Sequence, residues 1–195
     1  VGDIVIGQPD AAEAVPPGVE VFDTAGTGTF TTVTRYTKFY VTGSGATGGR
    51  VNGGAAATVI GYLDLPIGTV VNVDVGAGIP QSTKNVDGDK SRIIVNGDVL
   101  AKSNGAICPI YEGAAPYTAP FFNDGTLLLS DSRVSSGYIV KGARGGTDTN
   151  GDGAEESEGT ASFWGGCPAP GAGSMGHQNL TQQSTGDGIV MFEWT

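Results

Sequence analysis

The sequence predicts an all-β fold, an antiparallel, jelly-roll-like β-sandwich with glycine-rich loops. Short runs of β-forming residues alternate apolar and polar side chains, which is the pattern of strands with one buried face. Turn-forming residues separate these runs, and the chain holds 34 Gly and 10 Pro among 195 residues. No ten consecutive residues show the apolar period of a helix without a glycine or proline among them.

Length and composition fit one domain whose surface is poor in charge. The hydrophobic fraction of 38% is enough for a folded core, whereas charged residues make up only 15%. The formal net charge of −10 and the ten Lys and Arg residues argue against nucleic-acid binding. No apolar run approaches the ~20 residues of a membrane span, so we expect no membrane insertion. A surface of small polar residues suits packing against neighbouring proteins.

The first 18 residues are predicted to form an extended N-terminal arm, because Pro16-Pro17-Gly18 closes a segment with little strand pattern. Such an arm lies on a neighbouring subunit or is a disordered terminus, and the sequence leaves both open. Residues 19–195 then form a single glycine-rich β-sandwich domain, with a loop insertion at about 106–141.

Within this domain the strands follow one another at short intervals. The predicted strands are 20–24, 29–33, Tyr36–Val41, Thr58–Leu65, Thr69–Val75, Ser136–Lys141 and the final run GIVMFEWT. In Thr69–Val75 the valines alternate with Asn72 and Asp74, so we expect the valines to point inward.

Two hairpins are predicted from turn residues. In RIIVNGDVLA, residues 92–101, Asn96-Gly97 suits a type I′ turn that pairs Val95 with Asp98, Ile94 with Val99 and Ile93 with Leu100. In PFFNDGTLLL, residues 120–129, a second turn is expected at Asp124-Gly125.

The order of these pieces resembles the glycine-rich domain of bacteriophage tail and tail-fibre proteins. The matching stretches are KFYVTGSGATGG, LDLPIGTVVNVDVGAG at 63–78, DGDKSRI at 87–93, ASFWGG at 161–166 and the final GDGIVMFEW. The resemblance covers roughly 20–105 and 158–195. The second glycine segment is interrupted by Cys167, Pro168 and neighbouring residues, which argues against the packed bundle of polyglycine helices that some phage adhesins use.

The resemblance implies a non-enzymatic structural protein of a tailed-phage virion, assembled in the host cytoplasm. The favoured interpretation is a tail-tip or tail-fibre role in host attachment. The alternatives are a capsid decoration or head-fibre protein, and a secreted bacterial carbohydrate-binding or adhesion module. Other virion proteins and a host surface polysaccharide or protein are the implied partners, with a homo-oligomer, by analogy a trimer. Phe163 and Trp164, on the ASFWGG motif, are expected in the core or at a subunit interface.

Chemical motifs in the sequence are few. Gly43-x-Gly45-x-x-Gly48 follows a strand, but the glycine-rich residues after it will not hold the helix that dinucleotide binding needs. The single histidine, His177, has no serine elbow beside it, so we expect neither catalysis nor a bound cofactor.

A calcium site is the one metal hypothesis. Asp148, Asn150, Asp152 and Glu156 fall at positions 1, 3, 5 and 9 of a calcium loop, with Gly153 at position 6. Position 12 is a glycine and no helices flank the loop, so a solvated acidic loop is the competing interpretation.

Aromatic residues in the insertion are candidates for recognition. Tyr111, Tyr117, Phe121 and Phe122 lie in a proline-rich stretch, and loops on a rigid β-scaffold commonly carry binding. Capping of the core is the alternative role. Cys108 and Cys167 are too few for a disulfide framework, and the sequence favours two buried thiols over one bridge.

Overall fold

The computed structural model describes residues 15–48, 53–80, 86–108, 123–143, 161–174 and 184–195. These residues form strands and no helix, so the all-β prediction is confirmed and no described helix could cross a membrane. The strands are β1 (Gly18–Phe22), β2 (Gly26–Thr31), β3 (Tyr36–Thr42), β4 (Thr58–Asp64), β5 (Val70–Val75), β6 (Ser91–Val95), β7 (Asp98–Ser103), β8 (Gly125–Leu127), β9 (Val134–Val140) and β10 (Ile189–Trp194).

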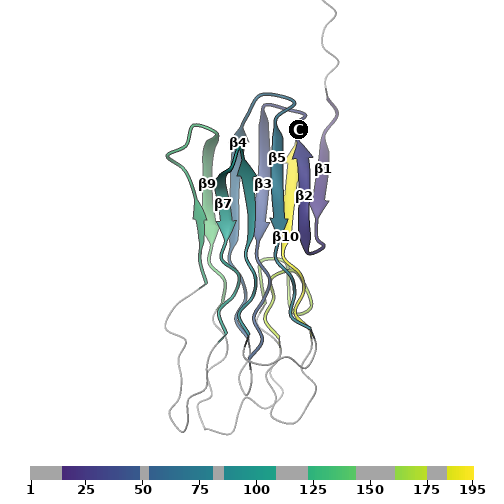
Figure 1. Ribbon diagram of the computed structural model, residues 1–195, viewed down its shortest axis with the longest axis vertical. Coiled ribbons are helices and arrows are strands. Elements are labelled where there is room, and N and C mark those ends of the chain that lie inside the picture. The colour runs from purple at the N-terminus through teal and green to yellow at the C-terminus, as the bar shows by residue number, and fades with distance from the viewer. Residues whose placement is uncertain (1–14, 49–52, 81–85, 109–122, 144–160, 175–183) are drawn as a thin grey trace, which may run out of the picture.

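The strands form two sheets of five. The first sheet has the order β1-β10-β3-β4-β9 and the second has the order β2-β5-β6-β7-β8. All neighbouring strands are antiparallel. The two sheets lie face to face (Figure 1), which confirms the predicted antiparallel β-sandwich.

Alternating side chains fill the space between the sheets. In β3 the core-facing residues Thr37, Phe39 and Val41 are buried, and in β5 Val71, Val73 and Val75 are buried, as the alternation predicts. Thr42 at the end of β3 is also buried. Phe30 from the second sheet stacks on Phe192 from the first, with ring centroids 4.1 Å apart and an interplanar angle of 10°. Burying a Phe side chain contributes about 1.5–3 kcal/mol, so this pair is a main contact joining the two layers.

The Asn96-Gly97 hairpin forms as predicted at its turn. Asn96 and Gly97 have φ angles of 53° and 90°, and Val95 pairs with Asp98 and Ile94 with Val99. The third predicted pair is wrong, because the register shifts between Ile93 and Ile94 and Ile93 pairs with Ala101. This β-bulge lets both Leu100 and Ala101 be buried.

The predicted turn at Asp124-Gly125 is also wrong. Gly125 begins β8, and its partner in β7 is Ser103. The chain instead turns after β8, where Asp131 N donates to Leu128 O at 3.1 Å and Val134 N donates to Asp131 O at 3.0 Å. The 106–141 interval therefore supplies β8 and β9, one edge strand to each sheet.

The described chain enters and leaves the sandwich at the same end. Trp194 Nε1 donates to the carbonyl oxygen of Pro16 at 3.0 Å, beside the start of β1. Residues 1–14 of the predicted arm lie outside the described residues. At the opposite end the chain continues beyond the sheets in extended segments (Figure 1), which we call the distal bundle.

Candidate functional site

The distal bundle gathers the glycine-rich segments that continue the strands. It consists of residues 43–48, 53–57, 76–80, 86–90, 104–108, 123–124, 142–143, 171–174 and 184–188. These segments do not form a ladder, because successive residues bond to different neighbours: Ser44 N donates to Asp89 O at 2.9 Å and Ala46 N to Gly54 O at 3.0 Å. A network of this kind ties each segment to several others.

Glycine is required here because main chains lie in direct contact. A Cβ atom on Gly45 would overlap the carbonyl oxygen of Ala172, and one on Gly53 would overlap that of Ala46. The same holds, against main-chain atoms, for Gly43, Gly76, Gly78, Gly88, Gly105, Gly142, Gly173 and Gly186. Ala46, Ala56, Ala106 and Cys108 form a small apolar cluster within the bundle.

The interruptions around Cys167 do not keep the second glycine segment out of this packing. Ala56 N donates to Gly171 O at 2.8 Å, and Ser174 N donates to Ala46 O at 3.1 Å. Residues 171–174 therefore pack closely with the first glycine segment, while the expectation against a bundle of polyglycine helices stays a prediction. Each of these residues is buried.

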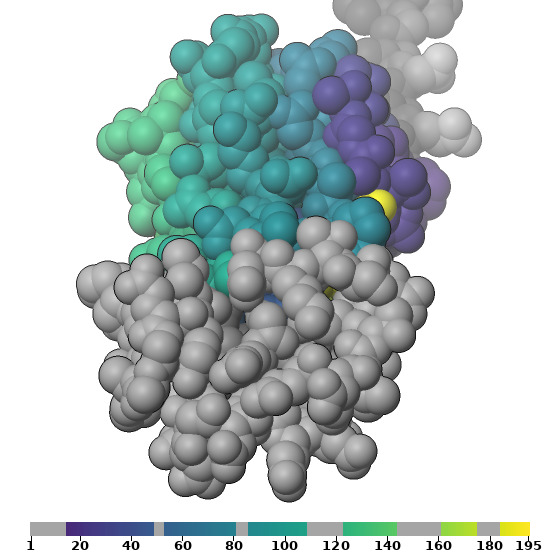
Figure 2. All heavy atoms as spheres, turned by 60° about the horizontal axis from the view of Figure 1, so that its bottom comes forward, coloured from purple at the N-terminus to yellow at the C-terminus, as the bar shows by residue number. Residues whose placement is uncertain are grey.

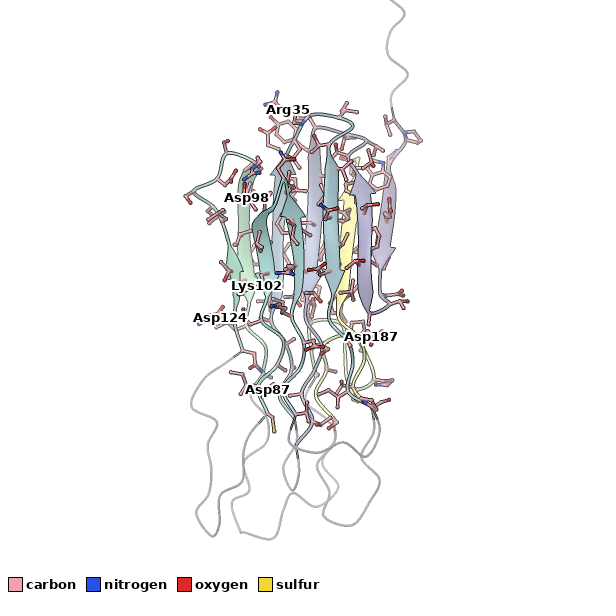
Figure 3. The ribbon with its side chains drawn as sticks, viewed as in Figure 1. Arg35, Asp87, Asp98, Lys102, Asp124 and Asp187 are labelled. Carbon is pink, nitrogen blue, oxygen red and sulfur yellow. The ribbon has the colours of Figure 1, made fainter. Side chains whose placement is uncertain are left out.

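Polar side chains in the bundle mainly form hydrogen bonds with main-chain N–H and C=O groups. Asn123 is buried, and its Nδ2 donates to Ala55 O at 2.6 Å while its Oδ1 accepts from Ile107 N at 2.8 Å. Asp187 accepts from Gly78 N at 2.7 Å and Ala25 N at 2.9 Å. Asp87 accepts from Cys108 N at 2.6 Å. Figure 3 shows Asp87 and Asp187 on the bundle side of the sheets, away from Arg35 at the other end. These side chains act as structural ties.

Several residues predicted from sequence lie outside the described residues. They are the calcium-loop residues Asp148, Asn150, Asp152 and Glu156 and the recognition residues Tyr111, Tyr117, Phe121 and Phe122. The structure leaves five internal intervals undescribed: 49–52, 81–85, 109–122, 144–160 and 175–183. The described residues on both sides of each interval lie in the distal bundle or beside it (Figure 1).

Phe163 and Trp164 are described and pack on the outer face of the first sheet. Their rings meet edge to face with centroids 5.0 Å apart, and Tyr40 of β3 lies 5.8 Å from Trp164. Trp164 Nε1 donates to Thr42 Oγ1 at 2.8 Å, whereas Phe163 remains 48% exposed. Neither residue is in the core between the sheets, so an interface role stays a prediction for Phe163.

Replacing Trp164 by Phe should lower the free energy of unfolding by about 0.5–1.5 kcal/mol, because the indole hydrogen bond is lost while the Thr42 hydroxyl keeps its hydrogen bond to the Thr58 hydroxyl. Denaturant unfolding measures this difference. Phe163→Leu is the matched control. Because the Phe163 ring is half exposed, this substitution should lower the free energy of unfolding by less. An equal or larger loss in Phe163→Leu would contradict this role of Trp164.

The remaining motifs singled out from the sequence are the glycine motif at 43–48 and the two cysteines. Gly43, Gly45 and Gly48 lie in an extended segment, and the described residues that follow form a strand, not a helix. Burial and the nearby Asp87 raise the pKa of the Cys108 thiol to about 11. Burial also raises the pKa of the Cys167 thiol. Both thiols are therefore protonated and weakly nucleophilic at neutral pH.

Sequence reasoning missed two features of potential function. Asn123 lies in a stretch interpreted as a hairpin arm, and no sequence signal marks it as a tie between segments. Exposed tyrosines on the first sheet were also missed, although the alternation in YTKFYVT and TVIGYLD places tyrosines on one side of each strand.

Together, the fold and its bundle define a class of protein: an antiparallel β-sandwich extended by closely packed glycine-rich segments. No family model, no curated protein and no solved structure matches this chain.

Proposed function

We propose that this chain is a non-enzymatic structural protein of a tailed-bacteriophage virion, a tail-tip or tail-fibre component that contributes to host attachment. The proposal starts from the resemblance of its motif order to glycine-rich tail domains. One structural observation supports it: Pro16 and Trp194 lie together at one end of the sandwich, while the described residues that flank the five undescribed intervals lie at the opposite end or beside it.

This arrangement suits a protein that is held at one end and makes contact at the other. Binding loops are effective when a rigid scaffold fixes their bases. The base of each interval here is held by main-chain hydrogen bonds, such as Gly53 N to Ser174 O at 3.0 Å and Thr47 N to Val86 O at 3.0 Å. Little further ordering of these bases is needed when a partner binds, which favours affinity.

Three carboxylates of the described residues are held in ion pairs with arginine, which is in keeping with a non-enzymatic role. Asp64 pairs with Arg35 at 2.6 Å, Asp131 pairs with Arg133, and Asp74 pairs with Arg92. The Arg133 hydrogen bonds lower the pKa of Asp131 to about 2. A carboxylate held ionised by an arginine on the surface is a poor general acid at neutral pH.

Host adsorption tests the recognition part of the proposal. Replacing Tyr117 and Phe121 together by Ala should slow adsorption at least about ten-fold, since aromatic residues dominate the energetics of many protein contacts. Thr31→Ala, on the exposed side of β2, is the control and should leave adsorption unchanged. Normal adsorption by the double variant, in particles with an unchanged copy number of this chain, would contradict the role.

Imaging of the particle tests the tail location. Density for the sandwich at the tail tip or along a fibre is the expected result. One copy at each capsomer would instead overturn the tail assignment in favour of capsid decoration. A chain absent from particles altogether would overturn the virion proposal as a whole.

A further inference from the structure

The outer face of the second sheet gathers the cations that have no carboxylate partner. The described ranges contain seven Lys and Arg residues, and five of them form ion pairs. The two that form none within these ranges are Lys90 and Lys102. Both lie beside Arg92: Lys102 is paired with it across β6 and β7, and Lys90 precedes it by two positions in an extended segment, on the same side. Figure 3 labels Lys102 on β7.

This grouping of cations is unfavourable without an anion. Like charges directly opposite each other on neighbouring strands repel, as Arg92 and Lys102 do here. Asp74 of β5 forms an ion pair with Arg92 from the other side. No carboxylate in the described part of the chain does the same for Lys102 or Lys90. In a chain with a formal net charge of −10, this face is therefore a local site of positive charge.

The ion pair with Asp74 leaves part of the Arg92 guanidinium available. Arg92 donates to Asp74 through its Nε atom, and its two terminal nitrogens donate to no group of the described residues. The side chain of Arg92 is 34% exposed, so these nitrogens can be reached from solvent. An arginine held in this way presents a planar set of N–H donors that matches the geometry of a carboxylate.

An open hollow of about 580 Å³ lies beside this arginine, across β2, β5 and β6 (Figure 2 shows this side of the molecule). Its outward-facing side chains are Thr27, Thr29, Asn72, Asp74, Arg92 and Ile94. The Thr27, Thr29 and Asn72 side chains form no hydrogen bond within the described ranges, unlike the polar side chains that tie the distal bundle together. Hydroxyl and amide groups therefore converge with the arginine on one space.

We propose that the outer face of β2, β5, β6 and β7 binds an acidic glycan. A sugar carboxylate pairs with Arg92 and Lys102. The hydroxyls of the sugar bond to Thr27, Thr29 and Asn72. A glycan built from uronic acids carries both kinds of group that this face can bind, and hydrogen bonds to ionised groups are about twice as strong as neutral ones, so the carboxylate fixes the ligand's position. This surface is separate from the aromatic residues of the insertion, and the inference does not depend on the virion assignment.

An acidic protein segment is the less suitable ligand for this face. Protein contacts depend on aromatic and aliphatic anchors, whereas Lys and Asp are depleted from their centres. Ile94 is the one apolar side chain among the outward-facing residues of the hollow. Inorganic phosphate would use the cations but not the hydroxyl and amide groups of β2 and β5. The volume of the hollow falls in the range of small-ligand sites, roughly 300–1,000 Å³.

Isothermal titration calorimetry of the purified full chain at low salt tests the site. The probes are oligosaccharides of galacturonic acid, of mannuronic acid and of hyaluronan, each compared with its methyl ester, which keeps the hydroxyls and removes the charge. At least one acidic probe should bind at least about ten-fold more tightly than its ester, because the ester cannot accept charge-assisted hydrogen bonds. Raising the salt to about 0.5 M should weaken this binding, because the cations lie at the surface.

Two variants place the binding on this face. Lys102→Met removes one charge, and Arg92→Lys keeps the charge but removes the planar donor set. Each should weaken binding of the acidic probe about five- to ten-fold. Lys38→Met is the matched control, because it removes the same charge from the outer face of the first sheet, and it should leave the affinity within about two-fold of wild type. Near-wild-type thermal unfolding checks that the variants fold, and the second variant keeps the test decisive if one misfolds.

Four results would overturn the proposal. The first is that no acidic probe binds, and the second is that an ester binds as tightly as its acid. The third is that a tetraglutamate peptide or inorganic phosphate binds as tightly as the acidic oligosaccharides. The fourth is that both variants keep wild-type affinity, or that the Lys38→Met control loses as much as they do. These measurements use neither particles nor host cells, so failure here is distinguishable from failure of the virion proposal.

Discussion

Gly45→Ala is expected to lower the free energy of unfolding by at least about 3 kcal/mol. Overpacking a closely packed site costs about 1–3 kcal/mol, and more where the neighbours cannot move. The added Cβ would overlap the carbonyl of Ala172 and approach the nitrogen of Gly173. These are main-chain atoms, and Ser44 and Ala46 on either side are held by hydrogen bonds to Asp89 and Gly54. No side-chain rotation can relieve the overlap, so the bundle must separate.

Gly166→Ala is the matched control for this experiment. Gly166 also belongs to a glycine-rich segment, but a Cβ there would meet nothing within 4 Å. Its free energy of unfolding should stay within about 0.5 kcal/mol of wild type, the usual range for surface changes. Urea unfolding of both variants gives the comparison. Equal stabilities would show that the close main-chain packing at Gly45 is not required for folding.

The strands were predictable because their signals are local. Alternation in TVVNVDV requires only that one face be buried, and the buried valines of β5 confirm it. The Asn96-Gly97 turn was likewise predictable, since it needs two positive φ angles that these residues readily adopt. Both features depend on residues that are neighbours in sequence.

The errors arise where distant segments decide the structure. Asp124-Gly125 has the composition of a turn, yet pairing of β8 with β7 extends the chain through it. The bulge at Ile93 and Ile94 depends on what Leu100 and Ala101 contact across the sandwich, which the hairpin's own sequence does not specify. Tertiary contacts override local preference in both places.

The distal bundle was the least predictable part of the candidate site. Glycine content indicates that main chains approach closely, but it does not indicate which segments meet. Gly45 contacts Ala172 across 127 positions of sequence, and nothing near either residue encodes that partnership. Composition therefore predicts that main chains pack closely. Which segments contact each other is determined by the sandwich, because its strands fix where each segment starts.

Asn123→Asp is expected to destabilise the protein by about 3–5 kcal/mol at pH 7, although the two side chains have nearly the same shape. The amide nitrogen of Asn123 donates to Ala55 O at 2.6 Å and lies 3.4 Å from Ala143 O. An aspartate would place a charged oxygen against these carbonyl oxygens in a side chain that is 2% exposed. Ile107 N could still donate to the other carboxylate oxygen, but the charge has no cationic partner, and a buried charge that is not paired with a cation costs about this much. Asn104→Asp, at an exposed position after β7, is the control and should change stability by less than about 0.5 kcal/mol.

The pH dependence of the Asn123→Asp variant separates charge from shape. Burial beside carbonyl oxygens raises the pKa of the new carboxyl in the folded state above its unfolded value of about 3.9. Below that value the carboxyl is protonated in both states, and its O–H can donate to Ala55 O in place of the lost amide. As the pH rises above about 4, the unfolded chain ionises first and the variant loses stability relative to wild type. Urea unfolding from pH 3.5 to pH 7 should therefore show a deficit that grows with pH. A deficit that is constant over this range would mean that the lost amide geometry, and not the buried charge, weakens the ties between the segments.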